Sequence, residues 1–169
     1  LRLEAMADAL EEQRRQSDMN ELDFEGRLGL LVERQWTWRE NRGLASRLKR
    51  AKFKISHACL EDLDYRSSRG LKRAQIDQLR TSQWLQEHRH CLVTGPTGSG
   101  KTYLGCALGI QACRDGYRSA YYYAPKLFRA LEAARVDGSL LHLLKQWART
   151  SLLVIDDLGI ANVPDRLYR

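Results

Sequence analysis

The sequence predicts an α/β fold, with helices on both faces of a parallel sheet and an all-helical region before it. Three short apolar segments are typical of strands, and segments with helical periodicity alternate with them. The third of these, Leu152–Ile155, is wholly apolar, as expected for a strand covered on both faces. The region before residue 56 shows the helical period alone. We therefore expect a three-layer αβα core that follows a helical segment.

The N-terminal region is expected to form helices throughout. Apolar residues from Leu3 to Leu10 recur at helical spacing and predict a helix over residues 2–15. Asp23 is a candidate N-cap for a second helix. This helix should reach about Arg39, and Gly43 either breaks it or only weakens it before the stripe continues to about Lys54.

The remaining residues divide into a linker and alternating elements. Residues 56–70 resemble a linker, so we separate a helical N-terminal region, 1–56, from an α/β core, 57–169. The expected elements of the core, in chain order, are a helix over 71–88, a strand at Cys91–Thr94, a helix over 101–114, a strand at Ala120–Tyr123, one or two helices over 126–148, and a strand at Leu152–Ile155.

The charge is concentrated in one stretch. The formal net charge is +7, yet residues 1–33 hold four basic and nine acidic residues. Residues 34–54 hold eight basic residues and one acidic residue, a pattern typical of a polyanion-binding surface. We predict that six of them contact the phosphates of duplex DNA: Arg42, Arg47, Lys49, Arg50, Lys52 and Lys54. A solvated helix face is the alternative. No membrane-spanning run or signal peptide is evident, so a cytoplasmic location is expected.

A glycine-rich motif follows the first predicted strand. Its pattern, G-x-x-x-x-G-K-[ST], is that of a P-loop, whose glycines let successive backbone N–H groups turn toward phosphate oxygens. The lysine reaches the β- and γ-phosphates, and the hydroxyl of the last residue is a ligand for Mg²⁺. The motif predicts that ATP with Mg²⁺ binds at Gly95, Pro96, Thr97, Gly98, Ser99, Gly100, Lys101 and Thr102.

Two aspartates follow the third predicted strand. Asp156 is the candidate carboxylate for the magnesium ion, and Asp157 is the candidate to polarise the attacking water. Room for one βα unit separates them from Lys101, as the sheet of a P-loop protein requires. Together with Lys101, Asp157 is a candidate catalytic residue for ATP hydrolysis.

These motifs resemble those of the AAA+ ATPases of the DnaC and IstB type. Residues 95–102 and 152–159 carry the shared motifs, while Phe24–Glu33, Arg39–Arg42 and the basic run to Lys54 are similar to the helical region of IstB-like proteins. The resemblance also covers Leu60–Tyr65, Arg114–Arg118 and Ala133–Leu140. It implies an ATP-binding, DNA-binding helper of insertion-sequence transposition. Such a protein assembles as a homo-oligomer on target DNA and recruits or stimulates a transposase.

The resemblance also implies a role for each residue of the site. Lys101, Thr102 and Asp156 would serve nucleotide and metal, and Asp157 stands where many relatives carry glutamate. The expected sheet order is 5-1-4-3-2, and three of its strands are found before residue 169. The resemblance fades after Gly159, so we expect a fragment without the sensor strand, arginine finger and lid. We expect its unpaired strand edges to make the isolated chain poorly stable or prone to associate.

Two other functions stay open at this point. A DnaC-like helicase loader shares the core motifs but uses its N-terminal region to hold a helicase. A remnant that binds nucleotide or DNA without turnover would also carry these motifs, so ATPase activity is left undecided.

Overall fold

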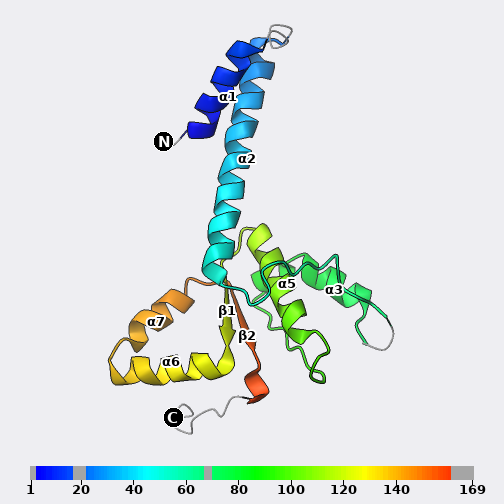
Figure 1. Cartoon of the computed structure of the whole chain (residues 1–169), viewed down its shortest axis with the longest axis vertical. Helices are drawn as coiled ribbons and strands as arrows, with labels where there is room; N and C mark the ends of the chain where they lie inside the picture. Colours follow the sequence, from blue (N-terminus) through cyan, green and yellow to red (C-terminus); the bar gives the residue numbers. More distant parts are fainter. Residues whose placement is uncertain (1–2, 17–21, 67–69, 161–169) are drawn as a thin grey trace. The chain divides into compact units, whose positions relative to one another are not determined.

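The computed structural model describes residues 3–16, 22–66 and 70–160. By its internal contacts the chain divides into two units, Leu1–Ser46 and Arg47–Arg169, and each is described by itself (Figure 1). The division falls ten residues before the boundary expected at residue 56, which rests on function and stays a prediction. No helix in the described ranges is long and apolar enough to cross a membrane.

The N-terminal unit is built from two helices, as predicted. Helix α1 spans Glu4–Arg15, and α2 begins at Phe24 and continues unbroken past Gly43 to Ala51. Asp23 caps α2, because its Oδ1 accepts a hydrogen bond of 2.8 Å from the backbone N–H of Gly26. The two helices lie side by side (Figure 1), and the backbone N–H of Met6 donates to Oε1 of the buried Gln35 at 3.1 Å.

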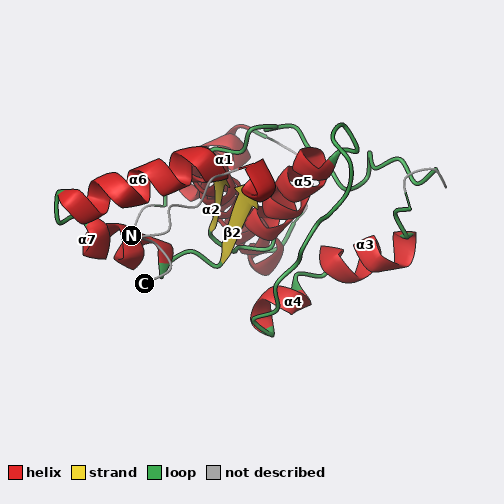
Figure 2. Ribbon diagram, turned by 90° about the horizontal axis from the view of Figure 1, so that it is seen from below, coloured by secondary structure: helices red, strands yellow, loops and turns green. Residues whose placement is uncertain are grey.

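The second unit contains two parallel strands. Strand β1 (Ser119–Tyr123) pairs with β2 (Leu152–Asp156), and the register sets Tyr121 opposite Val154 and Tyr123 opposite Asp156. The strands lie between α5 on one side and α6 and α7 on the other (Figure 2). These helices span Lys101–Arg114, Ala124–Val136 and Leu140–Trp147. The second and third predicted strands are therefore neighbours, as the order 5-1-4-3-2 requires.

The strand expected at Cys91–Thr94 is not formed. These residues have no regular secondary structure and pair with no strand, and Leu92 is 83% exposed. A strand is stable only when its backbone N–H and C=O groups are paired. In the expected order 5-1-4-3-2 this segment is strand 1, and its neighbours are strands 5 and 4. The two strands that form, β1 and β2, correspond to strands 2 and 3 of that order, and the described part of the chain holds no other strand. The apolar pattern alone therefore overestimated this element.

The third strand is also less covered than expected. Helix α5 packs closely on one face of β2, since a Cβ added to Gly105 would lie 3.2 Å from Cγ1 of Val154. On the opposite face Leu153 is 36% and Ile155 43% exposed. Tyr122 points to that face from β1, where its hydroxyl accepts a hydrogen bond of 2.8 Å from Nε1 of Trp147. The wholly apolar run of β2 is thus only partly covered on the face toward α6 and α7.

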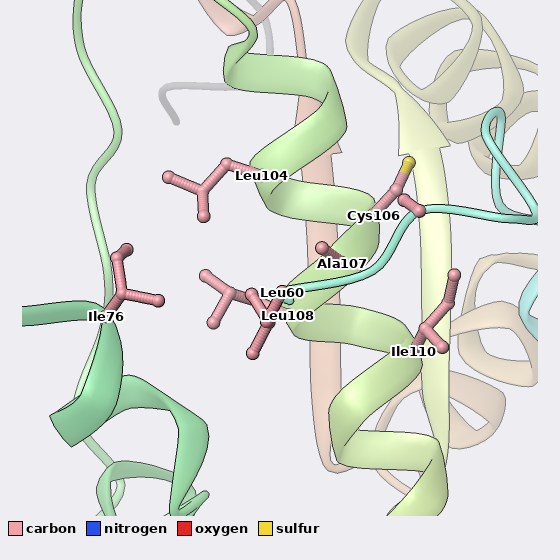
Figure 3. Close-up of a cluster of buried hydrophobic side chains, with 8 residues drawn as sticks. Leu60, Ile76, Leu104, Cys106, Ala107, Leu108 and Ile110 are labelled. Carbon is pink, nitrogen blue, oxygen red and sulfur yellow. The ribbon is translucent and has the colours of Figure 1, made fainter. Parts of the chain in front are cut away.

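The core of the second unit lies on α5 (Figure 3). Helix α3 (Arg73–Arg80) and the short α4 (Gln83–Gln86) occupy the predicted helix over 71–88. The segment expected as a linker contributes to this core, because Ala58 and Leu60 are only 1% and 4% exposed. The buried cluster consists of Ala58, Leu60, Ile76, Leu104, Cys106, Ala107, Leu108 and Ile110.

Candidate nucleotide site

The P-loop residues join the unpaired segment before Gly95 to the first turn of α5. Gly98 and Gly100 have φ angles of +80° and +89°, the left-handed region that favours glycine. Gly100 is the N-cap of α5 and provides no side-chain cap. The N–H groups of the first helical turn therefore lack intrahelical partners and are available to an anion, which the positive end of the helix also favours.

Lys101 folds back over the loop. Its Nζ donates hydrogen bonds to the carbonyl oxygens of Gly95 at 2.9 Å and Pro96 at 2.8 Å. These contacts hold the ammonium group at the glycine-rich loop. A phosphate oxygen entering the loop would find this positive charge close by, and it would compete with the two carbonyls for the ammonium protons.

Thr102 and Asp156 meet between α5 and the end of β2. The Thr102 hydroxyl lies 2.9 Å from Oδ2 and 3.1 Å from Oδ1 of Asp156. Both side chains are half-buried. The sequence placed these two residues at one metal site although they are 54 positions apart, and the structure brings them together.

A third side chain shares this carboxylate. The hydroxyl of Tyr121, on the neighbouring strand β1, donates to Oδ2 of Asp156 at 2.6 Å. Burial, and then the hydrogen bond and negative charge of Asp156, raise the pKa of Tyr121 well above its ordinary value. The phenol is therefore a donor at any physiological pH, and the carboxylate is its acceptor.

Asp157 turns the chain away from the strand. Its φ angle is +57°, and its backbone N–H donates to Oδ1 of Asp156 at 3.1 Å. Aspartate tolerates this left-handed conformation better than most residues. The Asp156 carboxylate thus receives donors from Thr102, Tyr121 and Asp157, while the expected role of the Asp157 side chain toward water stays a prediction.

Comparison with known proteins identifies the family of this chain. The IstB-like ATP binding protein family matches residues 1–166. The chain belongs to this family. It is 45% identical over 161 residues to the ATP-binding protein of insertion sequence IS1162 from Pseudomonas fluorescens, covering 95% of this chain and 70% of that protein.

Further relatives have similar names. An insertion-sequence ATP-binding protein of Sinorhizobium fredii is 42% identical over 158 residues, which are 94% of this chain and 64% of the relative. The IS21 ATP-binding protein of Pseudomonas aeruginosa is 28% identical and is covered to 60% of its length. The chain thus spans about two thirds of the length of these IstB-like relatives.

The residues of this IstB-like chain fit a magnesium ion. Mg²⁺ prefers oxygen ligands and commonly binds through one or two protein oxygens together with substrate phosphates. The Thr102 hydroxyl and the Asp156 carboxylate supply such oxygens at the start of the helix that the P-loop leads into. Lys101 and the loop N–H groups would hold the phosphates beside it.

Tyr121 was missed in the sequence. The sequence predicts Ala120–Tyr123 only as a strand, and packing in the sheet is what Tyr122 does against Trp147, with ring centroids 5.5 Å apart. Alternation along a strand places Tyr121 and Tyr122 on opposite faces. The available signal was that one tyrosine in the neighbouring strand must share a face with Asp156, but the sequence does not specify the register that selects Tyr121.

The six predicted DNA-contacting residues are not equivalent. Lys49, Arg50, Lys52 and Lys54 are exposed near the end of α2. Arg42 is exposed as well, but its guanidinium lies 4.9 Å from the Trp38 ring centroid and 3.9 Å from a Glu4 oxygen.

Arg47 differs from the other five, because it is half-buried and its Nε donates to the carbonyl oxygen of Cys113 at 2.8 Å. Its Nη2 is buried without a hydrogen-bond partner in the structure. This contact satisfies a carbonyl in the last turn of α5, where a positive charge is favourable. Arg47 therefore has a structural role that the charge pattern did not predict, and its expected DNA contact is the least accessible of the six.

Proposed function

We propose that this IstB-like chain binds ATP with Mg²⁺ through Gly95–Thr102 and Asp156, and duplex DNA through its basic segment. In this role it would help an insertion sequence transpose by assembling on target DNA and recruiting or stimulating a transposase. The observation that carries the nucleotide part is the meeting of Thr102 and Asp156, 2.9 Å apart, at the start of α5. The names of the relatives, which are ATP-binding proteins of insertion sequences, support the wider role.

Each residue of the site would have a separate task. Lys101 neutralises charge on the outer phosphates, and the N–H groups of the loop and first helical turn bind phosphate oxygens. Thr102 and Asp156 hold the magnesium ion, which supplies electrostatic stabilisation of the phosphate charge when bound. The apolar core behind α5 keeps these groups in place.

Lys101→Ala tests the nucleotide part of the proposal. Removing the ammonium group should weaken ATP binding by about thirtyfold, since a hydrogen bond to a charged group contributes about 2 kcal/mol. The measurement is a titration with a fluorescent ATP analogue in the presence of magnesium. Lys126→Ala is the matched control, because Lys126 is an exposed lysine of α6. Equal affinities of the Lys101 variant and the wild type would contradict the site.

The DNA part of the proposal predicts a steep salt dependence. Four phosphate contacts by Lys49, Arg50, Lys52 and Lys54 should lower log K by about 3.6 for each tenfold rise in salt. Changing all four to glutamine should remove most of that slope. The affinity of the wild-type chain should depend little on the DNA sequence, because phosphate contacts carry no sequence information. Lys126 and Arg129, both exposed on α6, provide a matched double variant that should keep the slope. Duplex affinity that is unchanged between low and moderate salt would contradict this assignment.

Binding without turnover is the second candidate function. The backbone of Asp157 is engaged with Asp156 at 3.1 Å. Its carboxylate is one methylene shorter than the glutamate that the family resemblance implies at this position, so its reach to a water is reduced. A phosphate-release assay with and without duplex DNA distinguishes the two candidates. A helicase loader is less favoured, because the named relatives are insertion-sequence proteins.

A further inference from the structure

We propose that Tyr121 is a positioning residue of the magnesium site. Its hydroxyl orients the Asp156 carboxylate toward Thr102 and so sets the affinity for the metal that accompanies the nucleotide. This inference rests on the proposed function of the P-loop and adds a residue that lies outside the P-loop and the acidic strand end.

The first support is the geometry of the hydrogen bonds. The Tyr121 hydroxyl donates to Oδ2 of Asp156 at 2.6 Å, a length typical of an O–H···O⁻ bond to a charged acceptor. Asp157 holds the other oxygen, Oδ1, through its backbone N–H at 3.1 Å. A carboxylate fixed at both oxygens cannot rotate about its terminal bond, so its orientation is set before any ligand arrives.

The second support is the position of Thr102. Its hydroxyl lies within 3.1 Å of both oxygens of this carboxylate and has one proton to donate. The lone pairs of the threonine oxygen therefore stay available for a metal ion while its proton points to Asp156. By orienting the Asp156 carboxylate, Tyr121 therefore also orients the Thr102 hydroxyl, which is the second metal-binding oxygen.

The third support is that the sheet holds Tyr121 itself in place. Its backbone pairs with Val154 in the parallel ladder, two residues before Asp156. Its ring packs against the buried cluster on α5. Partners of this kind, which hydrogen-bond a metal ligand from a rigid element, commonly change metal affinity by tenfold or more when removed.

The experiment compares Tyr121→Phe with Tyr122→Phe. Each change removes one hydroxyl from adjacent residues of β1, but Tyr122 faces the other side of the sheet and bonds to Trp147. The measurement is the magnesium concentration that half-saturates binding of a fluorescent ATP analogue, repeated with Mn²⁺ followed by electron paramagnetic resonance. We expect Tyr121→Phe to raise this concentration by about tenfold, and Tyr122→Phe to leave it within twofold of the wild type. Nucleotide binding without metal should be the same in all three proteins.

The outcomes separate the inference from the proposed function. Equal metal dependence in the two phenylalanine variants would overturn the role of Tyr121 alone. Failure of the wild-type chain to bind nucleotide in a metal-dependent way would overturn both.

A second variant covers the case in which Tyr121→Phe does not fold. Replacing Tyr121 by 3-fluorotyrosine keeps the ring and the hydroxyl, so its magnesium dependence should stay within twofold of the wild type. Its fluorine resonance should shift when Mg²⁺ is added to the nucleotide complex. An unchanged resonance would also overturn the inference.

Discussion

Gly109 in α5 lies directly against the ring of Phe53. A Cβ added at Gly109 would come within 2.3 Å of a ring carbon of Phe53. No real contact is this short, so the segment that follows α2 approaches α5 closely only because residue 109 has no side chain. This single residue allows Phe53 to cover the helix that begins with the P-loop lysine.

Gly109→Ala should therefore destabilise the chain. Overpacking of a filled site costs about 1–3 kcal/mol, which exceeds the gain of about 0.5–1 kcal/mol from replacing glycine inside a helix. Gly29→Ala in α2 is the control, because a Cβ there meets nothing within 4 Å and the midpoint should stay or rise. Urea unfolding followed by circular dichroism measures both, and a midpoint of Gly109→Ala at or above the wild type would contradict the packing.

The individual residues of the site differ in whether they can be predicted from the sequence. Lys101, Thr102 and Asp156 were predicted because phosphate and metal chemistry restrict the residue types and their spacing. Tyr121 was not, because its role depends on the strand register and on a hydroxyl reaching across to Asp156 at 2.6 Å. In the sequence, a strand tyrosine that bonds to a site carboxylate looks the same as one that only packs in the sheet.

At the scale of elements, the prediction of a helix or strand was confirmed where residues close in the sequence stabilise it. The helix over 101–114 was predicted at the limits that α5 has, since its caps and period are local in sequence. The prediction of a strand at Cys91–Thr94 was wrong, because a strand needs neighbouring strands as hydrogen-bond partners. The apolar pattern of one segment does not show whether such neighbours are present. The segment 56–70 was misjudged for a similar reason, since the burial of Leu60 is decided by α3 and α5.

The open edge of β2 carries a prediction of its own. Among the described residues β2 pairs only with β1, and Ile155 is 43% exposed beside that free edge. Exposed apolar edge strands pair with other chains, so we expect the 169-residue chain to associate. Ile155→Lys should reduce the mass measured by light scattering after gel filtration, because a charge on an edge strand opposes pairing.

Val136→Lys is the control for this experiment, because Val136 is 90% exposed at the end of α6 and outside the sheet. It should leave the association unchanged. A monodisperse wild-type monomer with a cooperative thermal transition would contradict the expected association.

At the scale of the whole molecule, the fold class and the family were both accessible from the sequence. The parallel pair β1 and β2, the helix after the P-loop and the all-helical N-terminal unit agree with the prediction. The distribution of charge also pointed to a basic segment near the end of α2, although Arg47 within it is engaged with Cys113. What the sequence could not provide was the set of long-range contacts within the second unit, such as that between Tyr121 and Asp156, that form the site.

The central claim is that Thr102 and Asp156 act together to hold the magnesium ion that binds with ATP. A double-mutant cycle with Thr102→Val and Asp156→Asn tests it, with ATP affinity measured by calorimetry in magnesium and in EDTA. Each single change should weaken magnesium-dependent binding by at least about tenfold, and the double variant should be little worse than either, since residues sharing one ion are strongly coupled. Additive losses, or an ATP affinity that is the same in magnesium and in EDTA, would contradict the claim.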